Sequence, residues 1–90
     1  MKTFEAAFLA GETKTYYMAG RFLRVVDALD NSLNLRWIKN GTINGEADLV
    51  GSFFAVDAGV AGEDFDSFTI ESLSAQTVKF SVSRWAVEAL

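Results

Sequence analysis

The sequence contains no cysteine, no histidine and no proline. The first two absences exclude disulfide frameworks, thiolate or imidazole metal sites, cysteine nucleophiles and Ser-His-Asp triads. Most familiar catalytic chemistry therefore lacks its residues, and we predict a protein that is not an enzyme, with no catalytic residues, no bound metal and no cofactor. The absence of proline leaves every residue able to donate a backbone hydrogen bond, as strands require.

The chain also lacks long apolar runs and an excess of positive charge. No segment approaches the roughly 18 consecutive apolar residues of a membrane-spanning helix, so we expect no membrane partner. The 12 acidic and 8 basic side chains give a formal charge of -4 at pH 7, which argues against direct binding to nucleic acid phosphates. The apolar residues after Lys2 are interrupted at Glu5 and are too few for a signal peptide.

The chain of 90 residues is predicted to form one domain spanning residues 1–90. Half of its residues are hydrophobic and 22% are charged, a balance typical of a compact globular domain. At this size, the free energy gained by burying apolar surface is close to the cost of ordering the chain. Because no disulfide can add stability, we expect contacts with copies of itself or with a partner.

Apolar and polar residues alternate along most of the chain, which indicates strands. The alternation extends over residues 4–8, 13–18, 21–29, 33–38, 66–73 and 77–82, with shorter apolar runs at 49–50 and 53–56. The clearest inward-facing sets are Leu33, Leu35, Trp37 and Val78, Phe80, Val82, which we expect to share one core. We predict an all-β fold, a single antiparallel β-sandwich or jelly-roll-like barrel of about seven to eight short strands.

Turn segments suggest which strands pair. Asn40-Gly41 favours a type I′ hairpin, because both central positions need positive φ. Asn44-Gly45 is a second candidate turn, so the sequence leaves open which Asn-Gly closes the hairpin, and it also leaves open a bulge between the two. Gly11-Glu12 predicts a hairpin between residues 4–8 and 13–18, and Ser74-Ala75 predicts that the last two strands pair with each other.

Acidic side chains gather in one segment that is rich in glycine and small residues. Their oxygens suit a hard cation such as Ca²⁺, but the spacing does not match an EF-hand, so we favour a solvated loop. The four residues are Asp57, Glu63, Asp64 and Asp66. Glu46 and Asp48 have the residue types of a glycosidase pair, but nothing in the sequence indicates a cleft around them.

Basic and aromatic residues also lie close in sequence, a combination found in proteins that bind single-stranded nucleic acid. They are Arg21, Arg24, Arg36, Lys39, Tyr16, Tyr17 and Trp37. The net negative charge opposes that function, so we expect Trp37 in the core and the two arginines of the strands paired with Asp27 or Asp48. Adjacent Tyr16 and Tyr17 face opposite sides of a strand, so one of them is exposed and both are interface candidates.

The C-terminal segment, residues 85–90, stays apolar after the last strand ends. Its interface candidates are Trp85, Val87 and Leu90. Chain ends that contact nothing are usually polar, so we predict that this segment meets a partner. The alternative is that Trp85 folds back and caps an open end of the sandwich.

Three stretches resemble small phage and prophage proteins associated with the virion. They are residues 20–28 (GRFLRVVDA), 33–41 (LNLRWIKNG) and 75–84 (AQTVKFSVSR), within a resemblance over about residues 13–84. The resemblance implies a non-enzymatic structural protein of a bacteriophage particle, capsid-associated as a decoration or vertex component, and it transfers no catalytic residues. The implied partners are other copies of the chain and other virion proteins, and the implied location is the virion, after synthesis in the host cytoplasm.

A second function class is open to a small β domain without catalytic residues. This alternative is a ligand-binding β module, such as a small carbohydrate-binding domain that stacks sugars on exposed Tyr or Trp rings.

Overall fold

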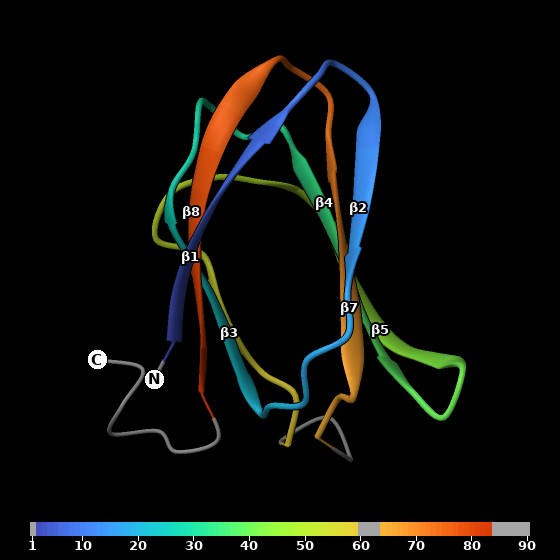
Figure 1. Ribbon diagram of the computed structural model, residues 1–90. Helices are drawn as coiled ribbons and strands as arrows, with labels where there is room; N and C mark the ends of the chain where they lie inside the picture. Colours follow the sequence, from blue (N-terminus) through green and yellow to red (C-terminus); the bar gives the residue numbers. More distant parts are fainter. Residues whose placement is uncertain (1, 60–63, 84–90) are drawn as a thin grey trace.

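The structure is a computed structural model that describes residues 2–59 and 64–83, and all regular structure in these residues is β-strand. The strands are β1 (Lys2–Phe8), β2 (Glu12–Tyr16), β3 (Phe22–Asp27), β4 (Leu33–Lys39), β5 (Thr42–Val50), β6 (Ala55–Asp57), β7 (Ser67–Ser72) and β8 (Gln76–Ser83). They form two four-stranded sheets, in the orders β1-β8-β3-β6 and β2-β7-β4-β5, which face each other (Figure 1). The prediction of a small antiparallel β-sandwich is confirmed.

Strand pairing follows a nested pattern. β4 pairs with β5, β3 with β6, β2 with β7 and β1 with β8, all antiparallel. The chain therefore forms one long hairpin ribbon with the β4–β5 turn at its tip. This ribbon is rolled up into two facing sheets. This is the strand order of an eight-stranded jelly roll, one of the two architectures that the sequence predicts.

The two outer hairpins predicted from sequence were wrong. β1 and β2 lie in different sheets, as do β7 and β8. The short connections at residues 9–11 and 73–75 carry the chain from one sheet to the other. Gly11 has a φ of 80° and donates its N–H to the Ser72 carbonyl at 2.7 Å, so this connection is hydrogen-bonded to the C-terminal end of β7.

The central hairpin confirms the first of the two Asn-Gly turns. Asn40 and Gly41 have φ values of 52° and 76°, as a type I′ turn requires. Asn44 and Gly45 lie inside β5, where the register with β4 shifts between Trp37 and Ile38. The bulge left open by the sequence is therefore present, and it places Gly45 opposite Trp37.

The strand at residues 42–50 is longer than predicted. Residues 42–43 and 49–50 belong to one strand, β5, and the next strand, β6, covers residues 55–57 instead of 53–56. Leu49 has a φ of 57° within β5, so the backbone bends there without leaving the sheet. Phe53, with a φ of 70°, turns the chain towards β6.

The core lies between the two sheets and contains all six side chains predicted for it. Its buried members are Phe8, Leu23, Val25, Leu33, Leu35, Trp37, Ala58, Phe65, Phe68, Ile70, Val78, Phe80 and Val82. Phe80 is central among the aromatic rings, with ring centroids 5.8 Å from Phe68 and 5.4 Å from Phe4. Lys79 and Thr77 are exposed, as predicted.

Candidate functional site: an apolar end of the sandwich

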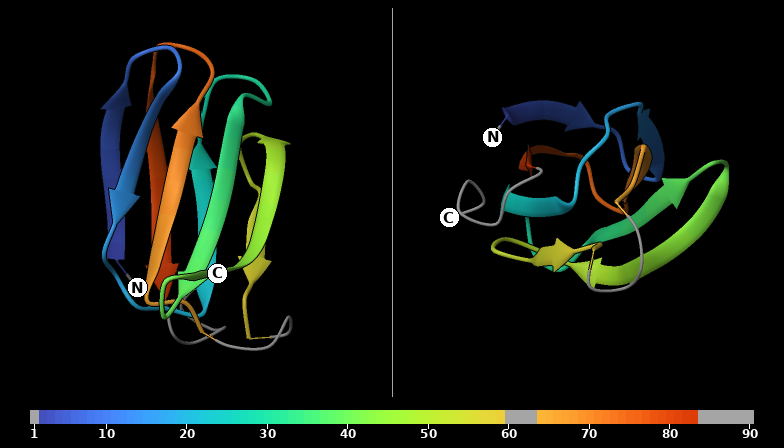
Figure 2. Two further views of the ribbon diagram at one scale, coloured as in Figure 1. Left: turned by 90° about the vertical axis from the view of Figure 1, so that its right-hand side faces the viewer. Right: turned by 90° about the horizontal axis from the view of Figure 1, so that it is seen from below.

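Four loops lie at the same end of the sandwich. β1, β3, β5 and β7 all run towards this end, so the connections β1–β2, β3–β4, β5–β6 and β7–β8 meet there, at the top of the left-hand view in Figure 2. The β4–β5 turn lies at the opposite end. The sequence alone does not bring these loops together, because at least 16 residues separate each loop from the next.

This end carries most of the exposed large hydrophobic side chains. Within the described residues, seven such side chains are exposed. Five of them belong to the four loops and their strand ends: Leu9, Leu29, Leu49, Phe53 and Leu73. Phe53 and Leu9 are 76% and 72% exposed. We call these five residues the apolar loop end.

Hydrogen bonds join the four loops into one row. The β1–β2 loop is bonded to β7 through Gly11, and Leu73 N–H donates to the Ser32 carbonyl at 2.9 Å. Ser52 joins the next pair of loops, because its hydroxyl accepts from Ala28 N–H at 2.9 Å and donates to the Ala28 carbonyl at 3.0 Å. The apolar side chains are therefore presented by connected backbone instead of by independent loops.

Gln76 is the centre of this row. Its side-chain oxygen accepts from Leu29 N–H at 2.6 Å, and its amide nitrogen donates to the hydroxyls of Ser32 and Ser72 at 2.7 and 2.8 Å. One side chain thus holds the β3–β4 loop against the start of β8. Such satisfied polar networks rigidify the segments that they join.

The backbone is strained at the same end. Asp30, Leu49 and Phe53 have positive φ values of 52°, 57° and 70°. For leucine and phenylalanine this conformation costs about 1 to 2 kcal/mol per residue. Strained residues persist where the surroundings fix them, and they concentrate at binding sites and switch regions. Here the strain places two exposed apolar side chains, Leu49 and Phe53, on the surface.

An exposed apolar surface on a fixed backbone is suited to contact with another protein. Several backbone and serine groups of the four loops are already hydrogen-bonded within the protein, so these groups keep their partners when the end is covered. Among the described residues, no group of three or more acidic side chains is placed to hold a metal ion. The described residues also contain no helix long and apolar enough to cross a membrane.

The two tyrosine candidates divide as their alternation predicts. Tyr17 is 86% exposed. Tyr16 packs inwards, with its ring centroid 5.2 Å from that of Phe68 and 5.0 Å from that of Phe80. Of the two tyrosines, Tyr17 is therefore the one that offers a ring to a partner, and it lies after β2, at the end opposite to the apolar loop end. Trp85, Val87 and Leu90 lie outside the described residues.

Tyr16 is also expected to make the folded protein less stable at alkaline pH. Burial, with a smaller contribution from the charge of Glu12, raises the pKa of Tyr16 above its ordinary value of 10.0. The folded protein thus holds this proton more tightly than the unfolded chain, and stability falls as pH rises past about 10. The Tyr16 hydroxyl is buried and has no hydrogen-bond partner among the described residues.

Tyr16→Phe is therefore expected to change stability by no more than about 1 kcal/mol at pH 7, because no hydrogen bond is lost. It should make stability less dependent on pH between 9 and 11, as measured by urea unfolding at a series of pH values. Tyr17→Phe is the matched control, since it removes an exposed hydroxyl. Equal alkaline slopes in the two variants would contradict this account of Tyr16.

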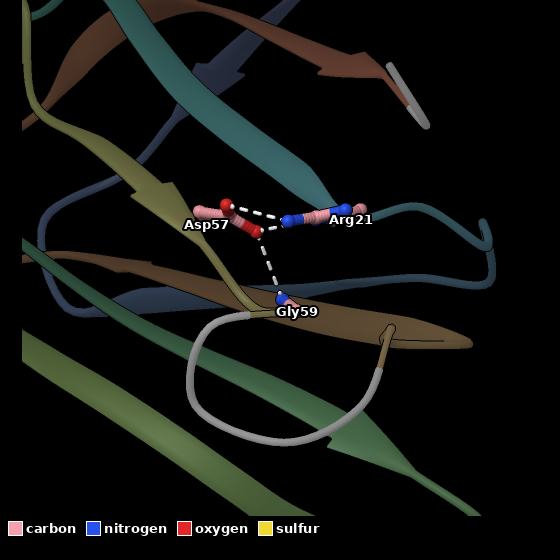
Figure 3. Close-up of polar contacts among 3 residues, drawn as sticks. All are labelled: Arg21, Asp57 and Gly59. Carbon is pink, nitrogen blue, oxygen red and sulfur yellow. Dashed lines mark hydrogen bonds and ion pairs between the residues drawn. The ribbon is translucent and has the colours of Figure 1, made fainter. Parts of the chain in front are cut away.

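Two carboxylates of the acidic segment, those of Asp57 and Asp66, form hydrogen bonds within the protein. Arg21 Nε and a second guanidinium nitrogen donate to the two carboxylate oxygens of Asp57 at 2.7 and 3.1 Å, and Gly59 N–H donates to the same carboxylate at 3.0 Å (Figure 3). The hydrogen bond and the negative charge of Asp57 raise the pKa of Arg21. Asp66 accepts from Asn40 N–H at 2.9 Å and thereby joins this segment to the β4–β5 turn.

Millimolar Ca²⁺ is expected to leave the melting temperature unchanged, because Asp57 and Asp66 already serve as acceptors within the fold. Differential scanning fluorimetry with Ca²⁺ and with Mg²⁺ as control tests this. A rise with Ca²⁺ that Asp64→Asn together with Asp66→Asn abolishes would show a calcium site, since a ligand of the folded state raises its stability. Glu63 lies outside the described residues.

The strand arginine Arg36 finds a partner other than the predicted one. It donates to Glu46 at 3.2 Å, instead of to Asp27 or Asp48, because β4 and β5 place Arg36 directly opposite Glu46. Asn34 donates to Glu71 at 3.2 Å and accepts from Leu49 N–H at 3.0 Å. The outer face of this sheet is thus lined with mutually bonded polar groups, and Glu46 faces an arginine instead of a second carboxylate.

The apolar loop end is not predicted by the sequence pattern. Leu9, Leu29 and Leu73 each stand within two residues of a turn residue, and a leucine next to a turn segment is the only signal that the sequence contains. Comparisons with protein-family models, with curated proteins and with solved structures gave no match.

Proposed function

We propose that this protein is a non-enzymatic structural component of a bacteriophage particle and that it acts by protein–protein assembly. The observation that carries the assembly function is the apolar loop end, where five exposed apolar side chains are held by four hydrogen-bonded loops. A surface of this kind is costly to leave in water unless a partner covers it. The expected location is the virion, and the expected partners are virion proteins and further copies of the chain.

Two further features of the chain favour a phage particle. The first is the resemblance of residues 20–28, 33–41 and 75–84 to small virion-associated phage proteins. The second is an analogy at the level of the fold, because viral capsid domains are among the proteins built as eight-stranded jelly rolls. Fold analogy alone does not assign a function, so the proposal depends on an experiment that tests the surface itself.

The experiment compares phage particles purified from genomes that encode the wild-type chain or one of its variants. The protein content of each preparation is measured. Mass spectrometry should find the chain in a fixed copy number per particle. The double variant Leu29→Ser with Phe53→Ser should fold, because both side chains are largely exposed, but should be lost from the particles. Ile43→Ser, which removes an exposed apolar side chain near the β4–β5 turn, is the matched control and should be retained.

Two outcomes would contradict the proposal. The chain would have no structural function in the virion if purified particles lacked it. The apolar loop end would have no part in assembly if the double variant entered particles as well as the Ile43→Ser control. Circular dichroism of each variant separates loss of contact from loss of folding.

A ligand-binding function is the second candidate, and Tyr17 is the observation that favours it. Its ring is 86% exposed and lies away from the apolar loop end. Exposed aromatic rings stack on sugars, and lectins are also found among jelly rolls. Binding to a glycan array that Tyr17→Ser abolishes, and that Leu29→Ser with Phe53→Ser leaves unchanged, would favour this function over assembly.

A further inference from the structure

In the described part of the chain, the sandwich has four edge strands, β1 and β6 in one sheet and β2 and β5 in the other. The free side of an edge strand presents backbone N–H and C=O groups that can pair with another chain. Proteins usually protect such edges by short strands, bulges or charged side chains that point inwards. The four edges differ sharply in this protection.

Three of the edges are protected. β6 has only three residues. β5 has two register shifts against β4 and the left-handed residue Leu49. β2 has five residues, and its Lys14 is turned inwards, with Nζ 5.1 Å from the centroid of the buried Phe8 ring. A second chain that paired with any of these edges would meet a short, distorted or charged strand.

Among its described side chains, those of residues 3–8, β1 shows none of these protective features. It runs for seven residues in unbroken register with β8. Its inward positions Phe4, Ala6 and Phe8 are apolar and pack on the core. Its one described charged side chain, Glu5, points outwards, with a carboxylate oxygen 3.8 Å from Lys79 Nζ. In the described part of the chain, β8 is the only strand that pairs with β1.

We propose that β1 pairs antiparallel with β1 of a second copy of this chain, about a two-fold axis at Ala6. A continuous sheet requires the inward residues of both copies to face the same side, and this register opposes Phe4 with Phe8 of the second copy. It also opposes Glu5 with Ala7, so no like charges face each other. An axis at Glu5 would bring two carboxylates together, which destabilises a cross-strand pair.

The pairing joins two four-stranded sheets into one of eight strands and closes as a dimer, because the same strand is used on both sides. The backbone supplies the affinity, as in other cases of strand addition to a sheet edge. This inference rests on the proposed assembly function, because it names a second copy as one of the partners. It leaves the other members of the apolar loop end, Leu29, Leu49, Phe53 and Leu73, free for a different contact, because only Leu9 continues β1.

Charge substitutions on the outward face of β1 test this register. Ala7 and Thr3 are both exposed, on the same strand and the same face. In the dimer, Ala7→Glu places a carboxylate opposite Glu5 at two symmetric positions. Sedimentation velocity of the full chain from about 1 to 300 μM should show a monomer–dimer equilibrium that Ala7→Glu weakens by about tenfold or more. Thr3→Glu, which faces no Glu5 in this register, should leave the equilibrium unchanged.

Ala7→Lys adds a positive test, because the lysine would face Glu5. This variant should dimerise at least as tightly as the wild type, and its dimer should weaken as salt rises from about 50 to 500 mM. Equal loss of the dimer in Ala7→Glu and Ala7→Lys would overturn the register, and loss with Thr3→Glu alone would place the axis elsewhere.

Two outcomes would overturn the inference while the proposed function stands. The first outcome is a wild-type chain that remains monomeric at every concentration but is still found in particles. Alternatively, a dimer would form that Leu29→Ser with Phe53→Ser abolishes and Ala7→Glu leaves intact, which would move self-contact to the apolar loop end. If the chain is absent from particles but dimerises as described, the proposed function fails and the β1 contact stands.

Discussion

Phe80→Ala is expected to destabilise the protein by about 3 to 5 kcal/mol, enough to unfold most molecules of a domain of this size. Phe80 is fully buried on β8, the central strand that pairs with both β1 and β3. Its ring contacts aromatic rings from both sheets, so truncation leaves a cavity that several rigid neighbours surround. Such a cavity collapses only in part, which adds to the lost burial of the ring.

Thermal and urea unfolding followed by circular dichroism measure this effect. Lys79→Ala and Thr77→Ala are controls on the same strand, with exposed side chains, and each should change stability by no more than about 0.5 kcal/mol. A Phe80→Ala variant that melts within a few degrees of the wild type would show that the two sheets do not share the core described here.

Gly45→Ala is expected to destabilise the protein by about 1 to 3 kcal/mol, even though alanine suits a strand better than glycine. Gly45 lies in β5 directly opposite Trp37, and a Cβ at this position would overlap the indole ring. The ring is 6% exposed and belongs to the core, so it has little room to move. The cost therefore arises from Trp37 and not from the backbone of Gly45.

A double-mutant cycle separates these causes. Trp37→Leu removes the indole atoms that the new Cβ would meet, and it breaks no hydrogen bond, because the Trp37 Nε1–H has no partner among the described residues. In this background Gly45→Ala should cost at least about 1 kcal/mol less than in the wild type. If the two substitutions change the free energy of unfolding additively, Gly45 is required for its backbone conformation and not for its contact with Trp37.

Local patterns in the sequence predict the strands but not how they pair. The alternation of Leu33, Leu35 and Trp37 defines one inward face, and Asn40-Gly41 fixes the one hairpin whose strands are adjacent in sequence. The alternation of apolar and polar residues does not show whether a short connection closes a hairpin or carries the chain to the other sheet. β1 and β2 alternate as hairpin strands would, yet their pairing partners are β8 and β7.

The apolar loop end could not be predicted from the sequence pattern for a related reason. An exposed Leu29 or Leu73 and a buried Leu33 or Leu35 are the same residue in a hydropathy profile, and only the positions of the loops distinguish them. The tyrosine pair shows what a local rule can achieve. Adjacent residues of a strand face opposite ways, so one exposed ring was predictable, but that Tyr17 is the exposed one required the partner strand β7.

The nested pairing sets an order in which the two sheets can form. Between β1 and β3 lies β8, so until residues 76–83 have been synthesised the sheet that contains them has only the β3–β6 pair. Contacts between segments this distant in sequence form slowly, because a long loop must close before they contribute. Until then β1 is an unpaired apolar strand on the nascent chain. The sheet β2-β7-β4-β5 can therefore form first, and the sheet β1-β8-β3-β6 is completed only when residues 76–83 are available.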